Sequence, residues 1–211
     1  FLSAEDANFF KHPGVDYRGL LRAGVQLALT GKKKQGGSTI TMQVARNFYL
    51  SQKKTYTRKL SEIFLALRIE EELSKPDILE LYLNKIYLGH RSYGVGAAAK
   101  VYYGKSVDEL TLAQTAMIAG LPKAPSRFNP LANPPRAVER RNYVLGRMLQ
   151  EGYIDQAEHD AASAEPISAS RYAPDTQVEA PYIAEMVRAE MVERFDQEAY
   201  TGGYLVYAAM T

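Results

Sequence analysis

The chain has 211 residues, of which 46% are hydrophobic and 24% charged, a balance typical of a globular protein. It has no cysteine, which excludes a disulfide framework and a thiolate metal site, and its three scattered histidines argue against a structural zinc site. No apolar run approaches the roughly 18 residues that a membrane-spanning helix needs, and no signal peptide is visible. Because the chain starts directly beside a motif, we expect it to be a piece of a longer protein.

The net charge of +2 is unevenly distributed along the sequence. Residues 1–60 contain eleven Lys/Arg and three Asp/Glu, a net charge of +8, whereas the remainder contains fifteen and twenty-one, a net charge of −6. A basic segment indicates an anionic partner, such as lipid headgroups, a phosphate-bearing substrate or nucleic acid. The alternative is a cationic face that simply contacts solvent.

Helical patterns follow one another along almost the whole chain. Ser3 and Asp16 predict the starts of two helices, and Thr57 starts a third that is apolar around more than half of its circumference. Further helices are expected from Ser74 to Gly89 and over 94–103, 111–121, 133–152, 155–162 and 181–198. We therefore predict a nearly all-α domain, and the stretch from Ala164 to Ala180, rich in Ser, Ala and Pro, predicts a linker.

The stretch from Gln35 to Glu62 carries the strongest chemical signal. Gly36 and Gly37 allow the backbone to approach a ligand closely, and hydroxyl groups, a carboxamide and several cations follow them. This order of groups suits a polyanion such as a diphosphate. The sequence has no Asp-x-Asp pair, so the cations themselves would have to neutralise the diphosphate.

Two carboxylates are candidates for catalysis. Glu5 can be a general base whose pKa is raised by the low-polarity surroundings of Phe9 and Phe10, or a first-turn residue that favours the helix dipole. Glu62 interrupts an apolar helix face, where a carboxylate is costly unless it is paired or used. It can therefore be a functional group or one half of a buried salt bridge with Arg58 or Lys59.

Five motifs resemble the peptidoglycan glycosyltransferase (transglycosylase) domain of class A penicillin-binding proteins of the 1A type, in that family's order. They are Glu5-Asp6…Phe9…His12-Pro13-Gly14, Gly36-Gly37-Ser38-Thr39-Ile40-Thr41…Gln43…Asn47, Arg58-Lys59…Glu62-Ile63…Ala66, Lys75…Ile78-Leu79…Tyr82-Leu83-Asn84…Tyr87…Gly89 and Arg140-Arg141…Val144-Leu145…Met148. Met42 and Arg46 depart from the family pattern, which often has Gln and Lys there.

The resemblance covers roughly residues 1–165, which would be the glycosyltransferase domain, and residues 166–211 would be a linker and the start of the region leading to a transpeptidase domain. It implies a lysozyme-like fold with a globular head and a smaller, membrane-facing jaw around residues 17–57. It also implies that the enzyme polymerises lipid II with inversion into β-1,4-linked glycan and releases polyprenyl diphosphate. Glu5 would be the general base, and Glu62 would assist the leaving diphosphate or organise the cations around it. The substrate-binding residues expected on this basis are Asp6, Phe9, His12, Gly37, Ser38, Thr39, Gln43, Arg46, Lys54, Arg58, Lys59 and Asn84.

The partners implied by the resemblance are lipid II, a lipid-linked glycan chain, the membrane surface beside the basic jaw, a transpeptidase domain in the full protein and moenomycin-type inhibitors. Nucleic acid is not among them. No cofactor or metal site is required, although a divalent cation, Mg²⁺ or Mn²⁺, is left open. The expected location is the outer, periplasmic side of the cytoplasmic (inner) membrane.

Two other functions compete with this interpretation. A lysozyme-like lytic enzyme that cleaves glycan would share the fold and one glutamate, but it would not need the cationic groove or Glu62. A non-catalytic basic module would bind nucleic acid or an anionic membrane in a salt-sensitive manner and would be indifferent to Glu5→Gln.

Overall fold

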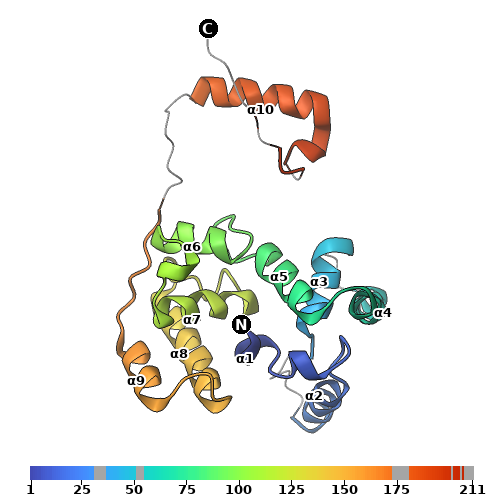
Figure 1. The fold of residues 1–211 in the computed structure, drawn as a ribbon, viewed down its shortest axis with the longest axis vertical. Helices are drawn as coiled ribbons and strands as arrows, with labels where there is room; N and C mark the ends of the chain where they lie inside the picture. Colours follow the sequence, from blue (N-terminus) through green and yellow to red (C-terminus); the bar gives the residue numbers. More distant parts are fainter. Residues whose placement is uncertain (31–36, 51–54, 173–180, 201, 205, 207–211) are drawn as a thin grey trace. The chain divides into compact units, whose positions relative to one another are not determined.

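The computed structural model describes residues 1–30, 37–50, 55–172, 181–200, 202–204 and 206, almost all of them in helices or the turns between helices (Figure 1). The only β-pairing within these described residues is an isolated antiparallel bridge between Tyr87 and Tyr93. The mostly α fold is therefore as predicted. The chain divides into two compact units, Phe1–Tyr172 and Ala173–Thr211.

The first unit contains short and long helices in close succession. They are α1 (Leu2–Glu5), η1 (Phe9–Lys11), α2 (Tyr17–Thr30), α3 (Ile40–Tyr49), α4 (Tyr56–Glu72), α5 (Lys75–Lys85), α6 (Val95–Tyr103), η2 (Val107–Glu109), α7 (Leu112–Gly120), η3 (Leu121–Lys123), α8 (Pro134–Gln150) and α9 (Gln156–Ala164). The second unit contains α10 (Pro181–Phe195) and η4 (Asp196–Tyr200).

Side-chain caps fix the beginnings of several of these helices. Thr39 accepts a hydrogen bond from the backbone N–H of Met42 at the start of α3. Thr55 accepts a hydrogen bond from the backbone N–H of Arg58 at the start of α4. This helix therefore begins at Tyr56, one residue before the expected Thr57. The first helix differs from its prediction, because Ser3 lies inside α1 and does not cap it.

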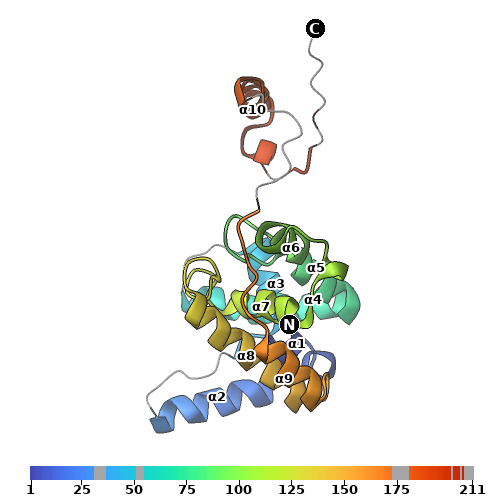
Figure 2. The same ribbon diagram turned by 90° about the vertical axis from the view of Figure 1, so that its left-hand side faces the viewer.

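The main core lies where α3, α5, α6 and α7 pack together. Its buried residues include Ile40, Val44, Tyr82, Tyr102 and Ile118. The helix α3, which we expected in the smaller jaw, thus belongs to the body of the first unit. Of the expected jaw, α2 extends away from the other helices of the first unit (Figure 2).

After α9 the chain returns along α6 as an extended stretch, residues 165–172, which we call the exit segment. Its backbone N–H groups at Ser170 and Tyr172 donate to the carbonyl oxygens of Tyr102 and Val101, both at 3.0 Å. The first compact unit consequently runs on to Tyr172. A functional domain boundary at residue 165 stays a prediction.

Among the described residues, no helix is both long enough and apolar enough to cross a membrane.

Candidate active site

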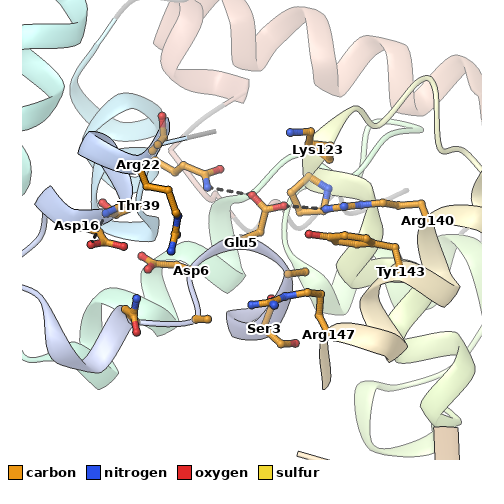
Figure 3. A pocket seen from close by; sticks show the side chains of 18 of the residues that line it. Ser3, Glu5, Asp6, Asp16, Arg22, Thr39, Lys123, Arg140, Tyr143 and Arg147 are labelled. Atoms are coloured by element: carbon orange, nitrogen blue, oxygen red, sulfur yellow. Dashed lines mark hydrogen bonds and ion pairs between the residues drawn. The ribbon is translucent and has the colours of Figure 1, made fainter. Parts of the chain in front are cut away.

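A pocket opens around Glu5, with walls from segments that are far apart in the sequence (Figure 3). Asp16 and Thr39 lie on one side of Glu5, and Lys123, Arg140 and Tyr143 lie on the other. The lining residues are Ser3, Ala4, Glu5, Asp6, Ala7, Asn8, Asp16, Gly19, Arg22, Gly37, Ser38, Thr39, Gln43, Arg46, Pro122, Lys123, Arg140, Tyr143 and Arg147.

The carboxylate of Glu5 is held between a carboxamide and a guanidinium. Gln43 Nε2 donates to Glu5 Oε2 over 3.3 Å, and Arg140 Nη2 donates to Glu5 Oε1 over 3.3 Å. Burial raises the pKa of Glu5 above its usual value, while Arg140, Gln43 and Lys123 act in the opposite direction. A carboxylate with a raised pKa and a fixed orientation is suited to accept a proton from a substrate.

The raised pKa agrees with the expectation from the sequence, but its origin differs. Phe9 is buried in the core with Lys75 Nζ 4.4 Å from its ring centroid, and Phe10 is exposed. The side chain of Glu5, which is 13% exposed, lies instead in a pocket whose walls are largely polar.

Asp6, the next residue, fixes the start of α3 beside Glu5. Its carboxylate accepts hydrogen bonds from His12 Nε2 at 3.0 Å and from the backbone N–H of Ile40 at 2.9 Å. Thr39 Oγ1 donates to the carbonyl oxygen of Gly14 at 2.5 Å. These bonds join residues 6–14 to the first turn of α3, from which Gln43 reaches Glu5.

Position 14 requires glycine, because the backbone there lies very close to α4. Its φ is +85°, and a Cβ there would lie 2.7 Å from the carbonyl oxygen of Ala66 on α4. The loop after η1 can therefore lie directly on α4.

Behind the Gln43 side of the pocket, Glu62 is buried with two cations. Lys59 Nζ donates to Glu62 Oε2 at 2.8 Å and to Ser38 Oγ at 2.7 Å. Arg58 Nε lies 3.2 Å from Glu62 Oε1, and the side chain of Glu62 is 1% exposed. Glu62 is not among the residues that line the pocket, and it reaches the pocket through Lys59 and Ser38.

The expected site residues therefore fall into two groups. The structure brings seven of them together in the pocket: Glu5, Asp6, Gly37, Ser38, Thr39, Gln43 and Arg46. Phe9, His12, Arg58, Lys59, Glu62 and Asn84 do not line it, and Lys54 lies outside the described residues. Asn84 is exposed near the end of α5. The structure shows where these residues lie, and the catalytic and substrate-binding roles of both groups stay predictions.

Several charged or polar lining residues were not predicted as site residues, although Arg140 belongs to the fifth motif: Asp16, Arg22, Lys123, Arg140, Tyr143 and Arg147. The spacing on α8 carried a usable signal. Arg140, Val144 and Arg147 share one helix face, and Val144 is fully buried there. Cations on an apolar stripe point toward the interior, so they indicate a buried anion or a pocket.

Arg140 is immobilised by its neighbours. Its Nε donates to the carbonyl oxygen of Gly120 at 3.2 Å, and its guanidinium carbon lies 4.6 Å from the ring centroid of Tyr143. Because these contacts fix the guanidinium, the Nη2 atom that faces Glu5 has little freedom to turn away.

Within the part of the chain that the structure describes, no group of three or more His, Asp or Glu side chains could hold a metal ion.

Comparison with known proteins identifies a family. The profile of the transglycosylase family matches residues 1–149. Penicillin-binding protein 1A of Pseudomonas aeruginosa is 60% identical over 205 residues, which are 97% of this chain and 25% of that protein. Penicillin-binding protein 1A of Escherichia coli is 56% identical over 211 residues, which are 100% of this chain and 25% of that protein.

A solved structure agrees with these relatives. The 2.6 Å crystal structure of penicillin-binding protein 1A from Haemophilus influenzae matches with a TM-score of 0.50 and 47% sequence identity. The match covers 76% of this chain and 21% of that one. The chain thus spans about a quarter of the length of the curated relatives that it matches.

Proposed function

Because the chain belongs to the transglycosylase family, we propose that it is a peptidoglycan glycosyltransferase that polymerises lipid II into β-1,4-linked glycan. The observation that carries this proposal is the setting of Glu5. A largely buried carboxylate with a raised pKa lies between Gln43 and Arg140 in a pocket lined by further cations.

The reaction is a single displacement at the anomeric carbon of the donor sugar. Glu5 removes the proton from the 4-hydroxyl group of the acceptor sugar, and that oxygen attacks the anomeric carbon. The new carbon–oxygen bond forms as the bond to the diphosphate breaks, so the configuration inverts. The proton ends on Glu5, and the leaving polyprenyl diphosphate takes the electron pair.

The side of the pocket that contains Gln43 is suited to the diphosphate. Arg22 and Arg46 line it, and the hydroxyl group of Ser38 lies there with Lys59 held behind it. Cations and hydroxyl groups placed in advance stabilise the charge that develops on a leaving group. In this arrangement Glu62 is a positioning residue, which acts through Lys59. We propose that moenomycin-type inhibitors, expected from the family resemblance, bind on the same side.

The expected contact with the membrane is supported by the surfaces of α2 and α4. Leu21 and Leu29 on α2 are exposed, as are Leu60 and Phe64 on α4. Arg18 and Arg22, both exposed on α2, add positive charge that would attract anionic lipid. From the family resemblance, we propose that the domain lies on the outer, periplasmic side of the cytoplasmic membrane, next to its lipid-linked substrates. A transpeptidase domain would follow in the full protein.

The decisive experiment is polymerisation of lipid II by this chain, with Glu5→Gln as the test variant and Glu80→Gln, on the exposed face of α5, as the control. Loss of a general base lowers rates by about 10²- to 10⁴-fold, so Glu5→Gln should make almost no polymer. The control should polymerise like the parent.

Two results would overturn the proposal. Cleavage of preformed glycan would favour a lytic enzyme. Salt-sensitive binding to nucleic acid or anionic vesicles, with no polymerisation and no effect of Glu5→Gln, would favour a non-catalytic basic module.

A further inference from the structure

Of the described residues that line the pocket, Tyr143 is the only aromatic one. It lies on α8, and its ring is next to the guanidinium of Arg140, at 4.6 Å between the guanidinium carbon and the ring centroid. Figure 3 shows both side chains extending from α8 toward Glu5. The residue remains 47% exposed, so a large part of its surface is open to a ligand.

The chemistry of this part of the pocket differs from that on the Gln43 side. Charged groups and hydroxyl groups recognise phosphate, but they do not offer a flat apolar surface. A sugar ring has one face made of C–H groups, and an aromatic ring is a surface on which that face can pack. Tyr143 is the residue of this pocket that provides such a surface.

The position of Tyr143 relative to Glu5 decides which sugar it would receive. Arg140 contacts both residues, since its Nη2 lies 3.3 Å from Glu5 Oε1 while its guanidinium stacks on Tyr143. Gln43 contacts the other carboxylate oxygen, at 3.3 Å. A sugar packed on Tyr143 would therefore approach Glu5 from the side opposite the residues suited to the leaving diphosphate.

We propose that Tyr143 is a substrate-binding residue on which the acceptor sugar, an N-acetylhexosamine, packs while Glu5 takes the proton from its hydroxyl group. This inference rests on the proposed function, because it assigns the acceptor of that reaction to a specific side chain. The ring fixes the tilt of the sugar, and Arg140 fixes the base that the hydroxyl group must meet.

The first test measures sugar binding without catalysis. The probe is the β-1,4-linked disaccharide of N-acetylglucosamine, titrated into the chain and followed by NMR. Tyr143→Leu, which removes the ring and keeps an apolar side chain, should weaken binding about three- to tenfold. Tyr143→Phe should bind within about twofold of the parent. Tyr153→Leu is the matched control, because Tyr153 is also exposed but does not line the pocket.

Glu5→Gln separates this inference from the proposed function. It should keep disaccharide binding and lose polymerisation. If the parent binds the disaccharide through Tyr143 but makes no polymer from lipid II, the proposed function fails and the sugar site remains. If Tyr143→Leu and the parent bind the disaccharide equally, the sugar site fails, whatever the polymerisation result.

A second readout tests whether Tyr143 only supports Arg140. In that case Tyr143→Leu would shift the pH dependence of polymerisation toward higher pH and leave disaccharide binding unchanged, which would overturn the proposal. A lower apparent affinity for lipid II with an unshifted pH profile would support it.

Discussion

Arg140 Nη2 lies 3.3 Å from Glu5 Oε1, although the two residues are 135 positions apart in the sequence. The contact joins α8 to the end of α1. Arg140 is also bonded to the carbonyl oxygen of Gly120 at the end of α7, so its orientation is set by elements other than α1. The pKa of Glu5, the proposed base, therefore depends on how α8 packs against α1 and α7.

Replacing Arg140 by glutamine should move the pH dependence of polymerisation to higher pH. Arg140 lowers the pKa of Glu5 against the effect of burial, so its removal raises that pKa further. A general base works only when it is deprotonated, so kcat/KM should begin to rise at a higher pH than in the parent. At neutral pH we expect a loss of roughly tenfold or more. The measurement is kcat/KM for lipid II from about pH 5 to 9.

Arg136→Gln provides the control, since Arg136 is exposed on the same helix and carries the same charge. It should leave the profile where it is. An Arg140→Gln profile that coincides with that of Arg136→Gln would show that Arg140 does not tune Glu5.

Glu62→Gln should reduce polymerisation without touching the pocket directly. The carboxylate holds Lys59, which in turn donates to Ser38 at 2.7 Å. Without that charge, Lys59 loses its fixed position, and misplacing a group that stabilises a leaving group costs on the order of 10²-fold in kcat. Because Lys59 is partly exposed, we expect the free energy of unfolding to fall by only about 1–3 kcal/mol.

The test compares activity and stability at one temperature. Glu71→Gln, on the exposed acidic end of α4, is the control and should change neither. If Glu62→Gln unfolds at the assay temperature, Glu62 is a stability residue. If it stays folded and fully active, the proposed role of Glu62 through Lys59 is wrong.

The sequence was informative wherever a residue conflicts with its local surroundings. Glu62 interrupts an apolar helix face, and of the two alternatives for it the structure shows the buried ion pair, with both Arg58 and Lys59. The residues after Gly37 predicted a ligand site, and several of them line the pocket. These signals are local, so they can be recognised without knowing which helices meet.

The other half of the pocket depends on long-range packing. Lys123 lies in η3, which follows α7, and Tyr143 lies on α8. Nothing in their immediate neighbours shows that both segments reach Glu5, because α1 and α8 come together only in the folded chain. The same limit applies to α3, whose helical pattern was clear while its burial between α4 and α5 was not.

Removing the hydroxyl group of a buried tyrosine should change the free energy of unfolding differently at Tyr82 and at Tyr102. Burial raises the pKa of both, that of Tyr102 to about 12. The hydroxyl group of Tyr82 has no hydrogen-bond partner among the described residues, whereas that of Tyr102 donates to Leu88 O at 2.9 Å and accepts from Asn129 Nδ2 at 3.2 Å. Tyr82→Phe should therefore leave the free energy of unfolding equal or raise it by about 1 kcal/mol, and Tyr102→Phe should lower it by about 1–3 kcal/mol.

Denaturant unfolding of both variants checks this pair, and each serves as the control for the other. Both substitutions keep the ring, so core packing is matched. A loss of more than about 1 kcal/mol in Tyr82→Phe would contradict the prediction, because it would show that this hydroxyl group makes a stabilising bond.

Arg141→Met should release the exit segment from the first unit. The guanidinium of Arg141 is buried and donates to the carbonyl oxygens of Glu165 at 2.6 Å and Ser163 at 2.8 Å. Methionine keeps much of the apolar volume but leaves both partly buried carbonyl groups without this donor, and losing each such bond costs about 1–2 kcal/mol. We expect the free energy of unfolding to fall by about 2–4 kcal/mol.

Limited proteolysis should detect faster cutting within residues 165–172, while Arg136→Met, on the exposed face of the same helix, should be cut like the parent. Equal protection of the exit segment in Arg141→Met would mean that the backbone bonds of Ser170 and Tyr172 to α6 hold it without the arginine.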